Sequence, residues 1–262
     1  MDNTAFDPTL IIFDLDGTLA QSKAPLDDDM SQLLGDLLKN KKVAVISGAS
    51  FAQFETQFLK HLHCKASQLN NLFILPEDGS DCFRYVKRFW GGKWKAVYQH
   101  KLSKSEKEKI SDALKQAVAQ VSQAQDLAIP KITYGEQIED RGSEITFSAL
   151  GQHAPLEKKS LWDANHSKRE AIVKVLTPLL SEFDIKIGGA TSIDITKNGM
   201  NKKFGIEAVS NLLHIPKSSI LYVGDSIFPG GNDYAAVEAG VTTRPVRDVD
   251  ETKAFIHAIL HS

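Results

Sequence analysis

The stretch IIFDLDGTLA, residues 11–20, places two aspartates directly after a run of apolar residues. The segment 9–13, TLIIF, is typical of a fully buried strand. Because ionised carboxylates are costly to bury, Asp14 and Asp16 at the end of such a strand indicate chemistry rather than packing. Which chemistry they perform depends on the residues that the rest of the chain brings to the same place.

Composition excludes several classes of function. The chain has 262 residues, enough for one large core or for a core with a second, smaller domain. Its formal net charge is −2 and basic residues form no block, so we expect no nucleic-acid partner. Two cysteines are too few for a disulfide framework or a zinc site. The N-terminal residues resemble neither a signal peptide nor a membrane span, so we expect a cytoplasmic protein without a membrane partner.

Strands and helices alternate at both ends of the chain. Apolar strand patterns at 9–13, 41–48 and 71–75 enclose helical patterns at 27–38 and 51–62. The alternation returns after residue 197, with helices at 203–213, near 232 and at 250–260, and strands at 219–225 and 241–246. This order predicts a parallel sheet wrapped by helices.

The middle of the chain has a different rhythm. Residues 83–100 predict a β-hairpin, and Ser103 with Glu106 predicts a capping box for a helix at 104–122. Strand-like segments follow at 131–135, 143–149, 185–189 and 191–196, and Ser167 with Glu170 suggests a second capped helix. We therefore predict an α/β protein: a Rossmann-like core from residues 1–82 and 196–262, with an antiparallel α+β cap at 83–195 inserted into it.

Four short polar segments lie at predicted strand ends of the core. They are residues 14–18 (DLDGT), 46–48 (ISG), 201–203 (NKK) and 224–233 (GDSIFPGGND). Because the carboxyl ends of parallel strands converge on one crevice, these segments are expected to meet. Carboxylates of this kind suit Mg²⁺, and a lysine and a hydroxyl can hold phosphate oxygens.

This set resembles the four catalytic motifs of the haloacid dehalogenase superfamily of phosphotransferases. The resemblance implies that Asp14 attacks phosphorus to form an aspartyl-phosphate, while Asp16 protonates the leaving oxygen and later activates the incoming nucleophile. It also implies that Ser47, Gly48 and Lys202 bind the phosphoryl oxygens. Mg²⁺ would be held by Asp14, the Asp16 carbonyl and Asp225, with Asn232 and Asp233 supporting these ligands.

Simpler interpretations stay open for several of these residues. Ser47 and Asn232 are both suited to capping the helix that follows them. Lys202 and Lys203 are neighbours, and one of them is expected to be a solvated surface charge. Arg141 could form an ordinary surface ion pair. The order of the motifs favours a phosphate-binding role for Ser47, and the resemblance favours Lys202 over Lys203 and a functional role for Arg141. For Asn232 the capping and the functional interpretations stay equally open.

The insertion narrows the resemblance further. An α+β cap between the second and third motifs resembles the sugar-phosphatase branch, and residues 188–203 and 229–233 resemble the eukaryotic-type phosphomannomutases. Through that resemblance, Arg141 matches a cap arginine that binds substrate phosphate. Ser192 and Asp194 match groups that contact the sugar.

Two departures from the mutase pattern decide our prediction of function. Gln152 and Lys159 stand where the mutases carry arginines that hold a second phosphate, and lysine does not replace arginine there. We therefore predict a Mg²⁺-dependent phosphohydrolase acting on a phosphosugar or similar small phosphate ester. A phosphomannomutase is the alternative, and a catalytically silent sugar-phosphate-binding protein is the third hypothesis. The sequence leaves a homodimer open.

Overall fold

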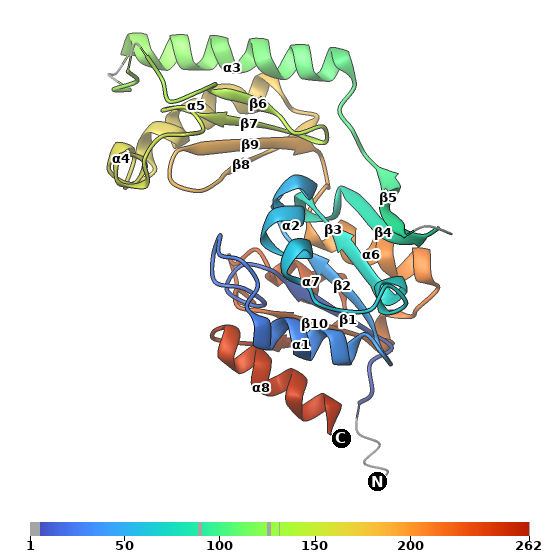
Figure 1. Ribbon diagram of the computed structural model, residues 1–262. Coiled ribbons are helices and arrows are strands. Elements are labelled where there is room, and N and C mark those ends of the chain that lie inside the picture. Colours follow the sequence, from blue (N-terminus) through green and yellow to red (C-terminus); the bar gives the residue numbers. More distant parts are fainter. Residues whose placement is uncertain (1–5, 89–90, 125–126, 131, 262) are drawn as a thin grey trace. The chain divides into compact units, whose positions relative to one another are not determined.

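The computed structural model describes residues 6–88, 91–124, 127–130 and 132–261. The chain divides into two compact units (Figure 1). The first unit is formed by Met1–Gln99 and Met200–Ser262, and the second unit by His100–Gly199. The second unit is therefore an insertion into the first.

A seven-stranded sheet forms the centre of the first unit, in the order β11-β10-β1-β2-β3-β4-β5. The first five strands in this order pair in parallel, and the last two pairings are antiparallel. The strands are β1 (Leu10–Asp14), β2 (Lys42–Ile46), β3 (Leu72–Leu75), β4 (Asp81–Lys87), β5 (Gly92–Gln99), β10 (Ile220–Gly224) and β11 (Thr242–Pro245).

Helices cover both faces of this sheet, because alternate residues of the buried strands point to opposite sides. Ile11 and Phe13 of β1 pack into a core with residues of α1 (Asp28–Leu37), α2 (Phe51–Gln57) and α8 (Val249–Leu260). Leu10 and Ile12 pack into a second core with residues of α6 (Lys202–Leu213) and α7 (Tyr234–Ala239). Short 3₁₀ helices complete the unit: η1 (Leu59–His61), η2 (Gln68–Asn71), η3 (Glu77–Gly79) and η4 (Lys217–Ser219).

The hairpin β4–β5 belongs to the first unit, whereas the sequence assigned residues 83–99 to the cap. Phe73 and Ile74 of β3 pair with Arg84 and Phe83 of β4, so the hairpin continues the core sheet. Phe83 also stacks on Phe51 of α2, with ring centroids 4.0 Å apart. The predicted boundaries at residues 83 and 195 therefore shift to residues 100 and 199. The alternating pattern predicted an antiparallel hairpin correctly, but it did not predict the sheet whose edge the hairpin joins. Residues 89–90 at its turn lie outside the described ones.

The second unit is an antiparallel four-stranded sheet with helices, in the strand order β6-β7-β9-β8. Ile145, Phe147, Ile193 and Ile195 pack from one face of the sheet against apolar residues of α3 and α5. The opposite face carries alternating polar residues. The elements are α3 (Lys104–Ala124), β6 (Ile138–Asp140), β7 (Glu144–Ser148), α4 (Leu156–Trp162), α5 (Ser167–Leu179), β8 (Phe183–Ile187) and β9 (Ser192–Lys197). The predicted fold class, a mainly parallel α/β sheet with an α+β insertion, is confirmed.

Of two helix caps and a strand predicted for the second unit, one cap is present, and the other cap and the described part of the strand are not. The capping box is present, because Ser103 N donates to Glu106 Oε2 (2.6 Å) and Glu106 N donates to Ser103 Oγ (3.3 Å). The predicted cap by Ser167 and Glu170 is wrong, since the backbone amides of Lys168 and Arg169 donate to the carboxylate of Asp163 instead. No strand forms over the described residues 132–135 of the predicted strand 131–135, and residue 131 lies outside them.

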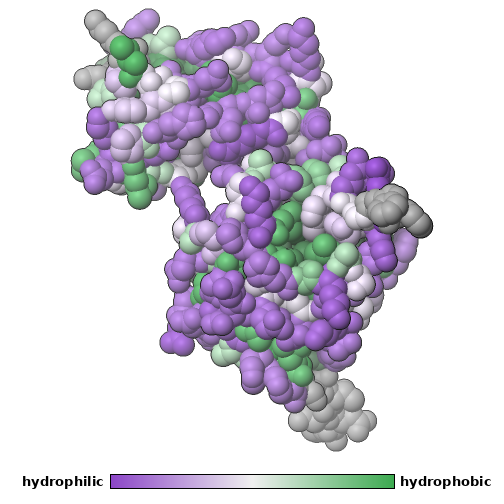
Figure 2. All heavy atoms as spheres, in the orientation of Figure 1, coloured by the Kyte–Doolittle hydropathy of each residue, from purple (hydrophilic) through white to green (hydrophobic). Residues whose placement is uncertain are grey.

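Figure 2 shows hydrophilic side chains over most of the viewed face, with smaller apolar areas between them. Among the described residues, the large apolar side chains that are exposed include Ile132, Leu156, Leu161 and Phe228. None of the described helices has the length and apolar composition needed to cross a membrane.

Candidate active site

The predicted motifs of the core meet at the carboxyl ends of three neighbouring strands. Asp14 is the last residue of β1 and pairs with Ile46, so Ser47 follows directly on the adjacent strand β2. On the other side, Phe13 pairs with Val223 of β10, which ends at Gly224 just before Asp225. The parallel register therefore brings residues separated by more than two hundred positions to one edge of the sheet.

Lys202 is the centre of the polar network at this edge. Its side chain is 2% exposed, and its Nζ donates to Asp14 Oδ1 (2.6 Å) and to Asp233 Oδ1 (2.7 Å). Lys202 is the first residue of α6, after the N-cap Asn201, whose side chain accepts from Phe204 N. The geometry places Lys202, rather than its neighbour Lys203, between the carboxylates.

A close approach of two glycines brings α6 to the sheet. A Cβ on Gly205 would lie 2.8 Å from Gly79 Cα and 2.8 Å from Ile46 Cδ1, so a side chain there would push the helix outward. Gly79 has φ +90, a conformation that glycine adopts without strain. The close approach of Gly205 to Gly79 therefore determines how near the start of α6, and with it Lys202, lies to the end of the sheet.

Tyr222 is a residue of the site that the sequence did not single out. It lies in β10 and is fully buried, and its hydroxyl donates to Asp233 Oδ1. Asp233 Oδ2 accepts from the backbone N–H of Ser226 at 3.1 Å. Asp233 thus receives hydrogen bonds from Lys202, Tyr222 and Ser226 and is held firmly. The available signal was a hydroxyl-bearing side chain in the otherwise apolar strand ILYVG.

Three carboxylates form a group that could hold a metal ion. One carboxylate oxygen from each of Asp14, Asp225 and Asp233 lies within 4.8 Å of the others. The carboxylate of Asp225 lies over Gly17, where a Cβ would come within 2.5 Å of its Oδ2. A set of hard oxygen donors of this kind fits Mg²⁺, which is bound by a few carboxylates and completes its shell with water and substrate. The sequence had given Asp233 only a supporting role.

Burial and mutual repulsion change the protonation of this group. Burial raises the pKa of Asp14 to about 7, with the charges of Asp233 and Asp225 adding to the rise and Lys202 opposing it. Burial and the charge of Asp233 also raise the pKa of Asp225. Burial alone would lower the pKa of Lys202, but Tyr222 and the two carboxylates beside it keep its pKa above the usual range. The arrangement therefore holds more negative charge than one lysine compensates, which favours a cation.

The carboxylate of Asp16 is turned to a different set of partners. Its Oδ1 accepts from Lys23 N at 2.7 Å and from Gln57 Nε2 at 3.0 Å. Asp16 is not part of the group of three carboxylates that could hold a metal ion. Its predicted metal contact is through the backbone carbonyl oxygen and stays a prediction. Gln57 lies at the end of α2 and was not predicted as a site residue, although it holds the predicted acid–base carboxylate in this orientation.

The loop after β2 is fixed by backbone hydrogen bonds. Ser47 is 4% exposed and its Oγ accepts from Ala49 N at 3.1 Å. Its carbonyl oxygen accepts from Asp78 N at 2.9 Å. Gly48 next to it is exposed, and so is Asn232, which precedes Asp233 at the start of α7. The helix α2 is capped by Ser50 and not by Ser47, so the capping alternative for Ser47 does not apply.

The predicted substrate-binding residues of the insertion lie within the second unit. Arg141 donates to Glu139 Oε2 (2.9 Å) and to Glu144 Oε1 (3.0 Å), with its side chain 22% exposed. Burial alone would lower the pKa of Arg141, but the charges of Glu144, Glu139 and Asp194 raise it. Ser192 and Asp194 point from β9 to the same face, beside the backbone of Gly188. Lys159, one of the two departures, donates to the carbonyl oxygen of Gln152, the other, at 2.8 Å.

Comparison with known proteins places the chain in a family. A family model described as haloacid dehalogenase-like hydrolase matches residues 11–239. The phosphomannomutase of Schizosaccharomyces pombe is 24% identical over 270 residues, covering 100% of this chain and 98% of that protein. A probable phosphomannomutase of Caenorhabditis elegans is 25% identical over 270 residues, covering 99% of this chain and 98% of that protein.

Solved structures show the same fold. The IMP-nucleotidase of Plasmodium falciparum has a TM-score of 0.69 at 16% identity, covering 97% of this chain and 63% of that one. A haloacid dehalogenase-like hydrolase of Bacteroides thetaiotaomicron has a TM-score of 0.65 at 12% identity, covering 97% of this chain and 100% of that one. The resemblance inferred from the motifs is confirmed, because the family model spans most of the sequence. The chain belongs to the haloacid dehalogenase-like hydrolases.

Proposed function

We propose that the protein is a Mg²⁺-dependent phosphohydrolase that cleaves a phosphosugar or similar small phosphate ester through an aspartyl-phosphate on Asp14. The observation that carries the proposal is the position of Asp14. It ends a buried strand beside Lys202 and shares a group of close carboxylate oxygens with Asp225 and Asp233. A nucleophilic carboxylate next to a fixed cation is what phosphoryl transfer through a covalent intermediate requires.

The residues of the first unit divide the proposed reaction between them. The free oxygen of the Asp14 carboxylate attacks phosphorus, the bond to the ester oxygen breaks, and Asp16 gives that oxygen its proton. In the second step Asp16 takes a proton from water, whose oxygen attacks phosphorus. The bond between phosphorus and the Asp14 oxygen breaks, which releases inorganic phosphate and restores the Asp14 carboxylate. Lys202 and the Ser47 loop bind phosphoryl oxygens throughout. For this role the Asp16 carboxylate has to exchange its contacts with Lys23 and Gln57 for the ester oxygen.

The three neighbouring carboxylates support a role for a metal ion in the proposed reaction. Asp14, Asp225 and Asp233 would hold Mg²⁺, whose charge would offset the repulsion between them and neutralise the oxygens of the phosphoryl group. The hydrogen bonds of Tyr222 and Ser226 fix Asp233 for this task.

Contacts within the second unit favour hydrolysis of the phosphosugar over its isomerisation by a mutase reaction. A mutase holds a second phosphate on cationic side chains, yet the guanidinium of Arg141 is engaged by Glu139 and Glu144. Lys159 donates to a backbone carbonyl. The polar face around Arg141 is rich in carboxylates, which repel a phosphate but accept hydrogen bonds from sugar hydroxyl groups.

A phosphomannomutase is the second candidate, because two relatives of that description match nearly the full length of the chain. One assay separates the two functions. Purified protein with Mg²⁺ receives mannose 1-phosphate, glucose 1-phosphate and other sugar phosphates, with and without a bisphosphosugar, while inorganic phosphate and the isomeric 6-phosphate are followed together. Release of phosphate without isomerisation supports the phosphohydrolase, and bisphosphate-dependent isomerisation with little release supports the mutase.

A variant of Asp14 tests the covalent mechanism. Asp14→Asn keeps the shape of the side chain but removes the nucleophilic oxygen, so turnover should fall by roughly three orders of magnitude or more. Asp36→Asn is the matched control, since Asp36 is a partly exposed carboxylate of α1 bonded to Lys39. Phosphate release by the Asp14 variant at the rate of the control would disprove the aspartyl-phosphate route.

A further inference from the structure

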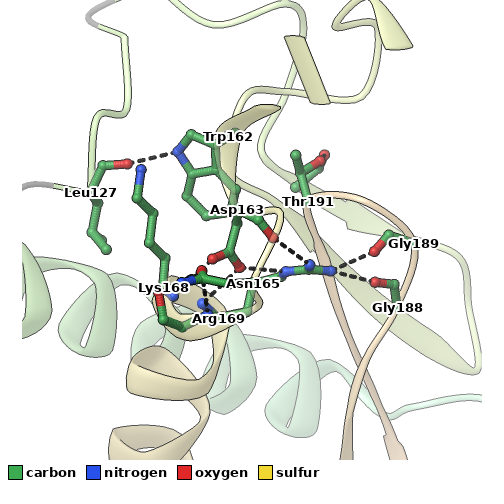
Figure 3. A network of polar contacts seen from close by, with 11 residues as sticks. Leu127, Trp162, Asp163, Asn165, Lys168, Arg169, Gly188, Gly189 and Thr191 are labelled. Carbon is green, nitrogen blue, oxygen red and sulfur yellow. Dashed lines mark hydrogen bonds and ion pairs between the residues drawn. The ribbon is translucent and has the colours of Figure 1, made fainter. Parts of the chain in front are cut away.

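A buried ion pair joins α5 to the loop that precedes it in the second unit. The side chains of Arg169 and Asp163 are 1% and 0% exposed, and Arg169 Nε donates to Asp163 Oδ2 at 2.7 Å. The same carboxylate accepts from the backbone amides of Lys168 (2.9 Å) and Arg169 (3.2 Å) (Figure 3). The carboxylate therefore caps the helix and fixes the plane of the guanidinium group.

The other side of the guanidinium faces the turn between β8 and β9. Arg169 Nη1 donates to the carbonyl oxygen of Gly188 at 2.6 Å and also to that of Gly189, while Nη2 donates to Asp163 O at 3.2 Å. Figure 3 shows the guanidinium lying between Asp163 and the two glycine carbonyls. The N–H of Gly188 in turn donates to Ser192 O at 3.1 Å. The turn is thus held by Arg169 on one side and by β9 on the other.

Gly188 is the support for two polar side chains of β9. A Cβ on Gly188 would lie 2.0 Å from Asp194 Oδ2 and 2.6 Å from Ser192 Oγ. Such distances leave no room for any side chain, so both polar groups rest directly against the glycine backbone. A movement of this turn therefore moves the surface against which Ser192 and Asp194 are oriented.

We propose that Arg169 is a positioning residue for substrate recognition: by holding the carbonyls of Gly188 and Gly189, it orients Ser192 and Asp194 toward the hydroxyl groups of a phosphosugar. The inference rests on the proposed function and on the expectation, drawn from the sequence resemblance, that Ser192 and Asp194 contact the sugar. A serine hydroxyl donates and accepts, and a carboxylate accepts, so together they suit a polyol. Neither needs to touch the phosphoryl group.

Arg169→Lys is the main variant. An ammonium group keeps the positive charge but cannot span a carboxylate and two carbonyls in the way the planar guanidinium does. Gly188→Ala is a second variant that displaces the same two side chains while leaving Arg169 intact, in case the lysine variant does not fold. Trp162→Phe is the control, because it removes the neighbouring buried bond from Trp162 Nε1 to Leu127 O (2.7 Å) and leaves the turn bonds in place.

The variants are compared in turnover, in binding and in hydrogen exchange. KM and kcat are measured for the best sugar phosphate and for p-nitrophenyl phosphate, which carries no sugar hydroxyls. Binding of the sugar phosphate is titrated by calorimetry in the Asp14→Asn background. Amide exchange is followed in peptides covering residues 188–194.

We expect Arg169→Lys and Gly188→Ala to raise KM for the sugar phosphate roughly ten- to a hundredfold. Their kcat and their turnover of the aryl phosphate should stay near those of the wild type, and exchange of the turn should accelerate.

The outcomes separate this inference from the proposed function. An unchanged KM for the sugar phosphate overturns the positioning role. An equal loss of kcat/KM on the sugar phosphate and on the aryl phosphate, reproduced by Trp162→Phe, overturns it too. If the wild type hydrolyses neither ester, the proposed function fails, and the calorimetric titration then decides whether Arg169 positions the sugar-binding residues. Weaker sugar-phosphate binding by the two variants then supports the inference, whereas equal binding, or no binding at all, overturns it.

Discussion

The replacement Asp14→Asn should stabilise the metal-free protein at alkaline pH, even though it removes the proposed nucleophile. Burial is the main reason that the pKa of Asp14 rises from 3.8 to about 7, and this value already includes the attraction of Lys202. A rise of about 3 units corresponds to about 4 kcal/mol, since one unit is worth about 1.4 kcal/mol. The folded state thus binds this proton more tightly than the unfolded state.

The sign of the pH dependence follows from the raised pKa. Stability contributed by protonated Asp14 is complete below pH 3.8 and is lost as the pH rises toward about 7. Asparagine has nearly the same shape and stays neutral, so the variant avoids this loss. The unfolding free energy of the variant should exceed that of the wild type by little near pH 4 and by about 4 kcal/mol at pH 8.

Urea unfolding in the presence of a chelator, followed by far-UV circular dichroism between pH 5 and pH 8, measures this difference. The pKa of Asp36 is lowered by its hydrogen bond from Lys39, so Asp36→Asn should show a small change of the opposite sign. Added Mg²⁺ should stabilise the wild type more than the Asp14 variant, because the cation offsets the ionised carboxylates. A difference between variant and wild type that is the same at pH 5 and pH 8 would show that a raised pKa of Asp14 is not its source.

Three further substitutions test the neighbours of Asp14. Lys202→Met leaves two buried carboxylates without their cation and should cost about 3–5 kcal/mol of unfolding free energy, together with most of the turnover. Activity near that of the wild type would show that Lys202 is not part of the active site. Gly205→Ala should destabilise by about 1–3 kcal/mol in thermal unfolding, because its Cβ would meet Gly79 Cα at 2.8 Å, although alanine favours a helix; a higher Tm would contradict the close approach. Tyr222→Phe removes a donor to Asp233 and should weaken Mg²⁺ binding, measured by titration, about tenfold or more, whereas unchanged affinity would show that Asp233 does not depend on it.

Much of the first unit could be predicted from the sequence because its signals are local. Buried parallel strands appear as apolar runs, and the segments that follow them carry the polar residues of the site. The hairpin 81–99 shows the limit of such signals. An alternating pattern indicates an antiparallel strand, but the partner strand β3 is chosen by pairing and by the contact of Phe83 with Phe51. The cap of α5 shows the same limit, since Asp163 lies four residues before the helix begins.

The family, the α/β class with its insertion, and the chemical types of the site residues could be inferred from the sequence, because these depend on short motifs and on periodicity. The folded chain was needed to see which charged side chains of the site pair with one another. It placed Lys202 between Asp14 and Asp233, added Tyr222 to the site and turned Asp16 toward Gln57. Hydrogen bonds and burial depend on distances between segments far apart in the chain, and no local pattern encodes those distances.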